Sequence, residues 1–220
     1  MNDQCSLLME QIKMKQKLII IGAGSVGKYI AYNQNDFQNN FEIIGFLDDD
    51  IAKHNTFIAA IPVLGSVNKI IEYANKGYAL VWGIAFPSIK NKLYNQYKNL
   101  QFDYPNFIAK NAWISQAVTI GKGCIIYPGC SVNYESSVGD FVVLNMNCAL
   151  GHNATIGNFA SFAPGVNLGG YTQIGDRTDM GIGSATKQFV KIGKDCVIGG
   201  QAMVIQNIED DKKVKGIPAK

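Results

Sequence analysis

The sequence lacks the runs and charge blocks that mark several common classes of protein. No apolar run approaches the roughly 18–20 residues that a membrane helix needs. The opening MNDQCSLLMEQIKMKQK places charges among short apolar pairs, unlike a signal peptide. The net charge is only +3 and no Lys/Arg block is present, so neither nucleic-acid binding nor membrane insertion is expected. The 220-residue chain is predicted to be a cytoplasmic globular protein of one or two domains.

Cysteine and histidine are also scarce. The five cysteines are an odd number without CxxC spacing, which favours a reducing compartment over a disulfide framework. Cys5 lies in a polar N-terminal extension, residues 1–16, and indicates nothing. The two histidines limit the candidates for proton transfer near neutral pH.

A sixfold repeat dominates the second half of the chain. From Ile108 to Val204 every sixth residue is aliphatic or large and apolar, except Thr186, and Gly often follows it directly. A period of six fits neither a helix nor a lone strand. A left-handed parallel β-helix produces it, with three short strands in each 18-residue coil, the aliphatic side chain inside, and a small residue four positions later. The turns are expected to require Gly or Asn, because the backbone there leaves ordinary β geometry.

The repeat also explains most of the cysteines. Four of them occupy the small inward position of their hexads: Cys124, Cys130, Cys148 and Cys196. Since free cysteine behaves as a small buried hydrophobe, these side chains are predicted to belong to the core and not to a metal or redox site.

The first part of the chain has the pattern of a small α/β domain. A strand at 17–21 precedes the turn GAGSVG, a helix to about residue 37 and a strand at 42–47. This is a βαβ unit with a phosphate-binding GxGxxG at the helix N-terminus. Further elements are expected as follows: an apolar segment at 60–64, a helix at 67–75, a strand at 79–84 and a helix at 89–97.

The length of this domain bears on its ligand. About 90 residues precede the repeat, half of what a dinucleotide-binding Rossmann domain needs, so a single nucleotide diphosphate is the better guest. The predicted architecture is therefore a Rossmann-like nucleotide-binding domain at 17–106, followed by a β-helix with a C-terminal tail at 107–220. Two alternatives remain open at this point. The Gly-rich turn would bind no ligand, and the acidic run 48–50 would form only a solvated loop.

One histidine in the β-helix is a candidate for catalysis. His152 takes the third position of its hexad, outside the inward set, and is interpreted as a general base, with an ordinary surface histidine as the alternative. Because residues 18 apart stack, Gly170 should lie on His152 and offer its backbone N–H to an oxyanion. A column of Pro164, Ile182 and Gly200 is small and flat enough for an extended acyl-pantetheine arm. The tail at 216–220 is expected either to close that groove or to have no ligand role.

The order of motifs makes the chain recognisable. GAGSVG, FLDDD, FDYPNFIAKNAWIS, ALGHNATIG and GIPAK together resemble the bacterial sugar-nucleotide acetyltransferases that pair a small Rossmann-like domain with a left-handed β-helix. This family includes the bacillosamine-pathway UDP-amino-sugar N-acetyltransferases, the GDP-perosamine N-acetyltransferases and the sialic acid O-acetyltransferase-like proteins. The resemblance extends over nearly everything from Lys17 onward, and it implies a homotrimer with active sites between β-helices and acetyl-CoA as cosubstrate.

The resemblance also assigns roles in catalysis. His152 would be the general base and Asn153 would touch or orient it. The bacillosamine enzymes have an acidic residue at the latter position, so Asn153 should leave the imidazole less basic. They also have a second histidine near the thioester, where this chain has Ser161. Ile182 and Gly200 would line acetyl-CoA.

The same resemblance places the nucleotide sugar in the first domain. Gly24, Ser25 and Val26 would meet the diphosphate, beside Gly22 of the same phosphate-binding turn. Asp48 and Asp49 would meet the base. The nucleotide and the sugar are left undefined by these positions.

The predicted reaction is N-acetylation of a nucleotide-linked amino sugar in a ternary complex, as a step in surface glycan biosynthesis. No activated Ser or Cys triad is visible, so an acyl-enzyme is not expected. The alternatives are O-acetylation of a sugar hydroxyl and a nucleotide-sugar-binding protein without catalysis. A metal enzyme of the carbonic anhydrase type would need about three converging histidines, and the repeat has one, so no metal is predicted.

Overall fold

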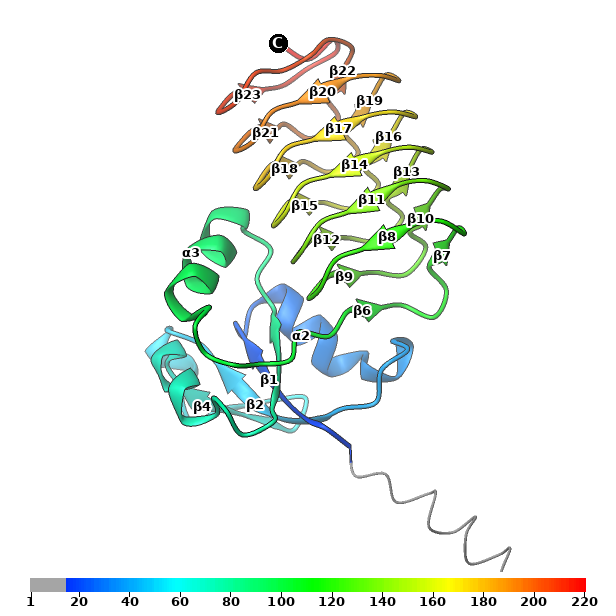
Figure 1. Ribbon diagram of the computed structural model, residues 1–220. Coiled ribbons are helices and arrows are strands. Elements are labelled where there is room, and N and C mark those ends of the chain that lie inside the picture. Colours follow the sequence, from blue (N-terminus) through cyan, green and yellow to red (C-terminus); the bar gives the residue numbers. More distant parts are fainter. Residues whose placement is uncertain (1–14) are drawn as a thin grey trace, which may run out of the picture.

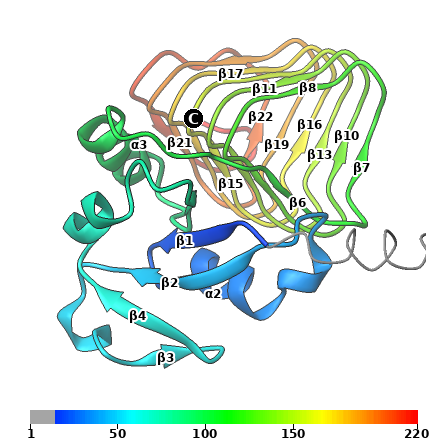
Figure 2. The same ribbon diagram turned by 60° about the horizontal axis from the view of Figure 1, so that its bottom comes forward.

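The computed structural model describes residues 15–220 and shows two parts, an α/β domain and a three-sided prism that rises from it (Figures 1 and 2). All but the end of the predicted extension 1–16, with Cys5, lies outside the described residues. The α/β domain covers the lower end of the prism, and the strands from β6 to β23 stack upward to the C-terminus (Figure 1). The predicted combination of a Rossmann-like domain and a left-handed β-helix is confirmed.

The first domain is built on a five-stranded sheet in the order β3-β4-β2-β1-β5, parallel except for β3. The central residues of the domain, Leu18–Ile21, are completely buried, as expected of a parallel strand covered on both faces. The strands are β1 (Lys17–Ile21), β2 (Glu42–Leu47), β3 (Phe57–Ile58), β4 (Ile61–Gly65) and β5 (Ala79–Trp82). The α-helices are α2 (Ser25–Tyr32) and α3 (Pro87–Tyr97), with 3₁₀ helices at Gln34–Asp36, Ile51–Lys53 and Val67–Glu72.

Two helices are shorter than predicted. α2 ends at Tyr32 because the amide of Asn33 turns back and donates to the carbonyl of Tyr29 at 2.9 Å, which satisfies the helix end. The predicted helix at 67–75 is a 3₁₀ segment that ends at Glu72. The antiparallel β3 was not predicted, since two residues are too few for a period to show.

The prism consists of two-residue parallel strands in three sheets. The seven-stranded sheet contains β6 (Phe107–Ile108), β9 (Ile125–Ile126), β12 (Val143–Leu144), β15 (Ser161–Phe162), β18 (Asp179–Met180), β21 (Val197–Ile198) and β23 (Lys213–Val214). The six-stranded sheet contains β7 (Trp113–Ile114), β10 (Ser131–Val132), β13 (Ala149–Leu150), β16 (Asn167–Leu168), β19 (Ala185–Thr186) and β22 (Met203–Val204). The five-stranded sheet contains β8 (Thr119–Ile120), β11 (Ser137–Val138), β14 (Thr155–Ile156), β17 (Gln173–Ile174) and β20 (Lys191–Ile192).

The pairing register confirms the 18-residue coil. Ser131 pairs with Ala149, and Ala149 with Asn167, so successive strands of one sheet come from successive coils. Only the last coil departs, because Val197 pairs with Lys213 after the sixfold pattern has ended. The predicted core cysteines are confirmed as buried and free: Cys124, Cys130, Cys148 and Cys196.

The repeat uses glycine for a different reason than the one predicted. The left-handed backbone, with φ near +60°, lies three residues after each hexad position from Ile114 to Ile198 and is often non-glycine, as at Asn153 and Phe159. The glycine that directly follows the aliphatic residue has no positive φ. It is needed because a Cβ there would meet the next coil: on Gly157 it would lie 2.5 Å from the backbone nitrogen of Asp176. The glycines that mark the repeat therefore permit close approach of coils.

Aromatic rings join the two domains. Tyr29 of α2 packs on Tyr127 of the prism with ring centroids 4.3 Å apart. On the side of the seven-stranded sheet, Tyr94 of α3 contacts Phe141 at 4.7 Å and Phe159 at 5.5 Å. One continuous hydrophobic cluster runs from β1 to the last coils of the prism. The two domains thus share a core.

The two roles of glycine predict different effects of the same substitution. A Cβ on Gly175 would lie 2.4 Å from the backbone nitrogen of Lys194, whereas on Gly165, at φ +73°, it would meet only the Cα of Gly183 at 3.9 Å. Gly175→Ala should lower the free energy of unfolding by about 3 kcal/mol through overpacking. Gly165→Ala should cost about 1 kcal/mol through backbone strain alone. Urea denaturation at equal protein concentration measures both, and equal losses would contradict this assignment of roles.

Candidate active site

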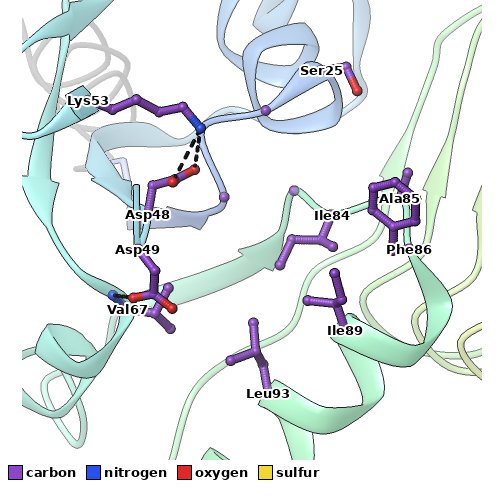
Figure 3. A pocket seen from close by; sticks show the side chains of 13 residues that line it. Ser25, Asp48, Asp49, Lys53, Val67, Ile84, Ala85, Phe86, Ile89 and Leu93 are labelled. Atoms are coloured by element: carbon purple, nitrogen blue, oxygen red, sulfur yellow. Dashed lines mark hydrogen bonds and ion pairs between the residues drawn. The ribbon is translucent and has the colours of Figure 1, made fainter. Parts of the chain in front are cut away.

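A cavity of about 400 Å³ opens where β1 and β2 end (Figure 3). Gly22, Gly24 and Ser25 form its floor at the N-terminus of α2. Gly27 lets the turn pack tightly, because a Cβ there would lie 2.0 Å from the carbonyl oxygen of Gly22. Val26 does not line the cavity, since its side chain is buried, and it can offer a ligand only its backbone N–H. The helix N-terminus presents N–H groups suited to an anion.

The acidic run 48–50 contributes hydrogen bonds and ion pairs that stabilise the backbone around this cavity. Asp48 accepts hydrogen bonds from the backbone N–H groups of Ala23 at 2.7 Å and Asp50 at 2.9 Å, and it forms an ion pair with Lys53 at 3.2 Å. Burial opposes ionisation of this carboxyl, but these hydrogen bonds outweigh burial and hold the pKa of Asp48 below its usual value. Asp48 therefore fixes the glycine-rich turn against the end of β2.

Asp49 is more exposed than Asp48. Its Oδ1 accepts the N–H of Val67 at 2.8 Å, while the side chain extends along the cavity wall (Figure 3). Sequence reasoning missed Lys53, whose ammonium reaches into the same cavity. It also missed the apolar wall after β5, because only the fold brings that wall to the glycine-rich turn; its members are Ile84, Ala85, Phe86, Ile89 and Leu93.

His152 lies in the turn between β13 and β14 and is half-buried. Its Nδ1 is 2.9 Å from Oδ1 of Asn153. The ring stacks on Tyr134 with centroids 5.2 Å apart and meets Tyr171 edge-on at 5.1 Å. Since an amide oxygen can only accept, Nδ1 must donate, and in a neutral imidazole the lone pair is then on Nε2. The contact with Asn153 thus favours the tautomer that has its lone pair on Nε2.

Gly170 stacks on this imidazole, as predicted from the 18-residue coil. A Cβ at Gly170 would lie 2.9 Å from Nε2 of His152, so only glycine leaves space beside the basic nitrogen. The coils are joined here by the N–H of Tyr171, which donates to the carbonyl of His152 at 2.9 Å. A small group can approach Nε2 from this side.

The predicted column of small residues is also present. The N–H of Gly183 donates to the carbonyl of Pro164, and the N–H of Gln201 donates to that of Ile182, so these coils stack in register. Ile182 is 60% exposed, which makes an apolar strip on the outside of the prism. The tail returns to this end of the prism, where the N–H of Ala219 donates to Met203 at 2.8 Å.

The two groups of candidate residues lie on different sides of the prism. His152 sits at the edge between the six-stranded and five-stranded sheets. The cavity lies beside the seven-stranded sheet, because its wall residue Ala85 accepts a hydrogen bond from Ser161 of β15. The structure therefore gathers Gly22, Gly24, Ser25, Asp48 and Asp49 in one place and His152, Asn153 and Gly170 in another.

Ser161 belongs to the junction between the domains. Its side chain is buried, and its hydroxyl donates to Ala85 and accepts from Nζ of Lys90 at 3.2 Å. Nζ of Lys90 also donates to the carbonyl of Phe141 at 2.8 Å. Burial lowers the pKa of Lys90 to about 7. Two acceptors match the two N–H groups of a neutral amine, so the buried lysine is satisfied without its charge.

Two features are absent from residues 15–220. No helix there is long and apolar enough to cross a membrane. No group of three or more His, Cys, Asp or Glu side chains in this part of the chain could hold a metal ion.

The α/β domain and the left-handed β-helix together have the architecture of solved acetyltransferases, and this similarity supports an acyltransferase of the left-handed β-helix class. Residues 17–97 match the family described as the PglD N-terminal domain. The comparison with curated proteins gave no significant match. The resemblance inferred from the sequence, to sugar acetyltransferases with hexapeptide repeats, is confirmed by the structural comparisons.

Solved structures match almost the whole chain. The acetyltransferase domain of PglB from Neisseria gonorrhoeae FA1090 is 27% identical with a TM-score of 0.86, over 93% of this chain and 98% of that chain. WeeI from Acinetobacter baumannii AYE is 25% identical with a TM-score of 0.83, over 93% and 99%. PerB from Caulobacter crescentus, solved with CoA and GDP-perosamine, shares the fold at 24% identity and a TM-score of 0.85, over 93% and 96%.

The buried lysine predicts a pH dependence of stability. With a pKa of about 7 in the folded protein, against about 10.4 in an unfolded chain, Lys90 binds fewer protons when folded between these values. Relative to Lys90→Met, the free energy of unfolding of the wild type should therefore rise by up to about 1.4 kcal/mol per pH unit from pH 7 to 10. Denaturant titrations at several pH values measure this difference.

The matched control is Lys92→Met, an exposed lysine on the same helix. Its stability should follow that of the wild type at every pH. Parallel curves for the wild type and Lys90→Met would show that Lys90 is not buried in its neutral form.

Proposed function

We propose that this protein transfers the acetyl group of acetyl-CoA to the amino group of a nucleotide-linked sugar, with His152 as general base. The observation that carries the proposal is the environment of His152. Its Nδ1 is engaged by Asn153, and Nε2 faces the space that Gly170 leaves open. An imidazole so held suits proton transfer near neutral pH.

The nucleotide sugar is assigned to the cavity of the first domain. A volume of about 400 Å³ suits a mononucleotide-sized ligand. The diphosphate would meet the N–H groups of Gly24, Ser25 and Val26 at the start of α2, with Gly22 shaping the turn. Asp49 would meet the base. Asp48 would act mainly by holding the turn, because its oxygens already bind Ala23, Asp50 and Lys53.

Acetyl-CoA is assigned to the outside of the prism. The exposed Ile182 and the small Gly200 form the strip along which an extended pantetheine arm can lie. The PglB acetyltransferase domain, 26% identical, has been solved in complex with acetyl coenzyme A. The contact of Ser161 with the cosubstrate stays a prediction, and its hydroxyl would have to release Lys90 or Ala85 to make it.

The assembly proposed is a homotrimer. In one chain His152 lies at one edge of the prism, whereas the cavity packs beside the opposite sheet. A neighbouring copy can bring its cavity to His152, so three copies around an axis would form three composite sites. Exposed apolar side chains on the same edge of the prism as His152 support a contact there, namely Tyr134, Tyr171 and Phe189.

The reaction follows from these positions. The sugar amine attacks the thioester carbonyl while Nε2 of His152 takes the amine proton, and a C–N bond forms. The oxyanion would be met by the N–H of Gly170. The C–S bond then breaks, and the imidazolium returns its proton to the CoA thiolate. The cysteines described are buried in the prism, which supports direct transfer without an acyl-enzyme.

Release of free CoA thiol across a panel of 3- and 4-amino nucleotide sugars tests this function. His152→Ala should lower kcat by at least about a hundredfold, the scale of a lost general base, while calorimetry shows acetyl-CoA binding retained. Lys194→Ala, a partly exposed residue at the same hexad position of another coil, is the control and should keep the activity. Thiol release only with hydroxyl acceptors would replace N- by O-acetylation, and an undiminished His152→Ala would remove the base.

A further inference from the structure

We propose that Glu135 is a positioning residue, which acts through Asn153 to fix the protonation form of His152. This inference rests on the proposed function, since it assigns a role in the use of the same imidazole. The observation is a chain of two hydrogen bonds: Nδ2 of Asn153 donates to Oε2 of Glu135 at 2.8 Å, and Oδ1 of Asn153 lies 2.9 Å from Nδ1 of His152.

The coil geometry brings these side chains together. Glu135 and Asn153 are 18 residues apart and occupy the same left-handed turn position, with φ of 56° and 58°. The coils are joined beside them by the N–H of Asn153, which donates to the carbonyl of Tyr134 at 3.0 Å. The rings of Tyr134 and His152 stack in the neighbouring column. Two parallel stacks, one polar and one aromatic, therefore hold the imidazole.

The carboxylate decides which way the amide of Asn153 points. An amide has an accepting oxygen and a donating nitrogen, and an ionised carboxylate can only accept. Glu135 therefore draws the NH₂ group toward itself and leaves the oxygen for the imidazole. Nδ1 of His152 must then donate, so the lone pair resides on Nε2, beside Gly170. Without Glu135 the amide can turn over and favour the opposite tautomer.

The same carboxylate also acts by its charge. When Nε2 takes a proton, the imidazolium gains an oriented amide dipole and, behind it, a negative charge. The expectation that Asn153 leaves the imidazole without acidic support considered only the adjacent residue. The side chains that face the ring are Tyr134 on one face, Tyr171 at its edge and Asn153 at Nδ1. Among residues 15–220, Glu135 is the carboxylate hydrogen-bonded into this group.

Two substitutions separate orientation from charge. Glu135→Gln keeps an oxygen that can accept from Asn153 but removes the charge, whereas Glu135→Leu removes both. ¹⁵N NMR of labelled histidine reports the tautomer directly, and with only His54 and His152 in the chain, His152→Ala assigns the signals. Above neutral pH the wild type should show Nδ1–H at His152. Glu135→Gln should keep it, and Glu135→Leu should show a mixture or the opposite tautomer.

The kinetic effects should follow the same order. For an acceptor identified in the thiol-release panel, kcat should fall about tenfold in Glu135→Gln and about a hundredfold in Glu135→Leu, with KM for acetyl-CoA within about twofold of the wild type. Asp211→Leu, at an exposed left-handed turn with φ of 63°, controls for leucine at such a position and should match the wild type.

The outcomes distinguish this proposal from the proposed function. If no acceptor is acetylated by the wild type, the function fails, and the tautomer in Glu135→Leu still tests the hydrogen-bond chain. An Nε2–H tautomer in the wild type, or an unchanged tautomer and kcat in Glu135→Leu, would overturn the role of Glu135. Circular dichroism melts identify a variant that fails to fold, and in that case Glu135→Gln decides through its kcat.

Discussion

The structure depends on the hydrogen bonds that join each coil of the prism to the next. Every strand has only two residues, so no strand is stable alone, and the register is held by backbone bonds repeated at 18 residues, such as Tyr171 to His152. Glycines after the aliphatic positions let the coils approach closely enough for these bonds, as at Gly157 and Gly175. This spacing places Gly170 on the imidazole and Glu135 beneath Asn153. The proposed chemistry is therefore a product of stacking more than of local sequence.

The fold followed from the sequence wherever a period was long enough to read. The sixfold rhythm predicted the coil and the buried cysteines, and the βαβ pattern predicted β1 and β2 with their bounds. The 18-residue coil also predicted the contact of Gly170 with His152, because residues 18 apart stack on each other. The reason for the repeated glycines was misread, since positive φ and close approach both favour glycine and only coordinates separate them.

The sequence could not reveal contacts between elements that share no period. Lys90 meets Ser161 and Phe141 only because α3 packs against the prism, and Lys53 reaches Asp48 only because a 3₁₀ turn folds back. The 18-residue coil stacks Glu135 on Asn153 as it stacks Gly170 on His152, but the spacing alone does not show that these two side chains form a hydrogen bond. The candidate site was thus predicted where side chains are stacked and missed where they meet across domains.

Because the two domains share a core, the height of each coil above the α/β domain is fixed. Aromatic packing fixes the first coil on the α/β domain, and each coil adds about 4.8 Å of height. An extra coil inserted below His152 would leave every inward side chain in an equivalent environment, so folding itself would tolerate it. In the proposed trimer, however, the extra coil would move the imidazole away from the cavity of the neighbouring copy by more than the length of a hydrogen bond. Under the proposed function, the number of coils below His152 is therefore constrained by the geometry of the reaction and not by stability.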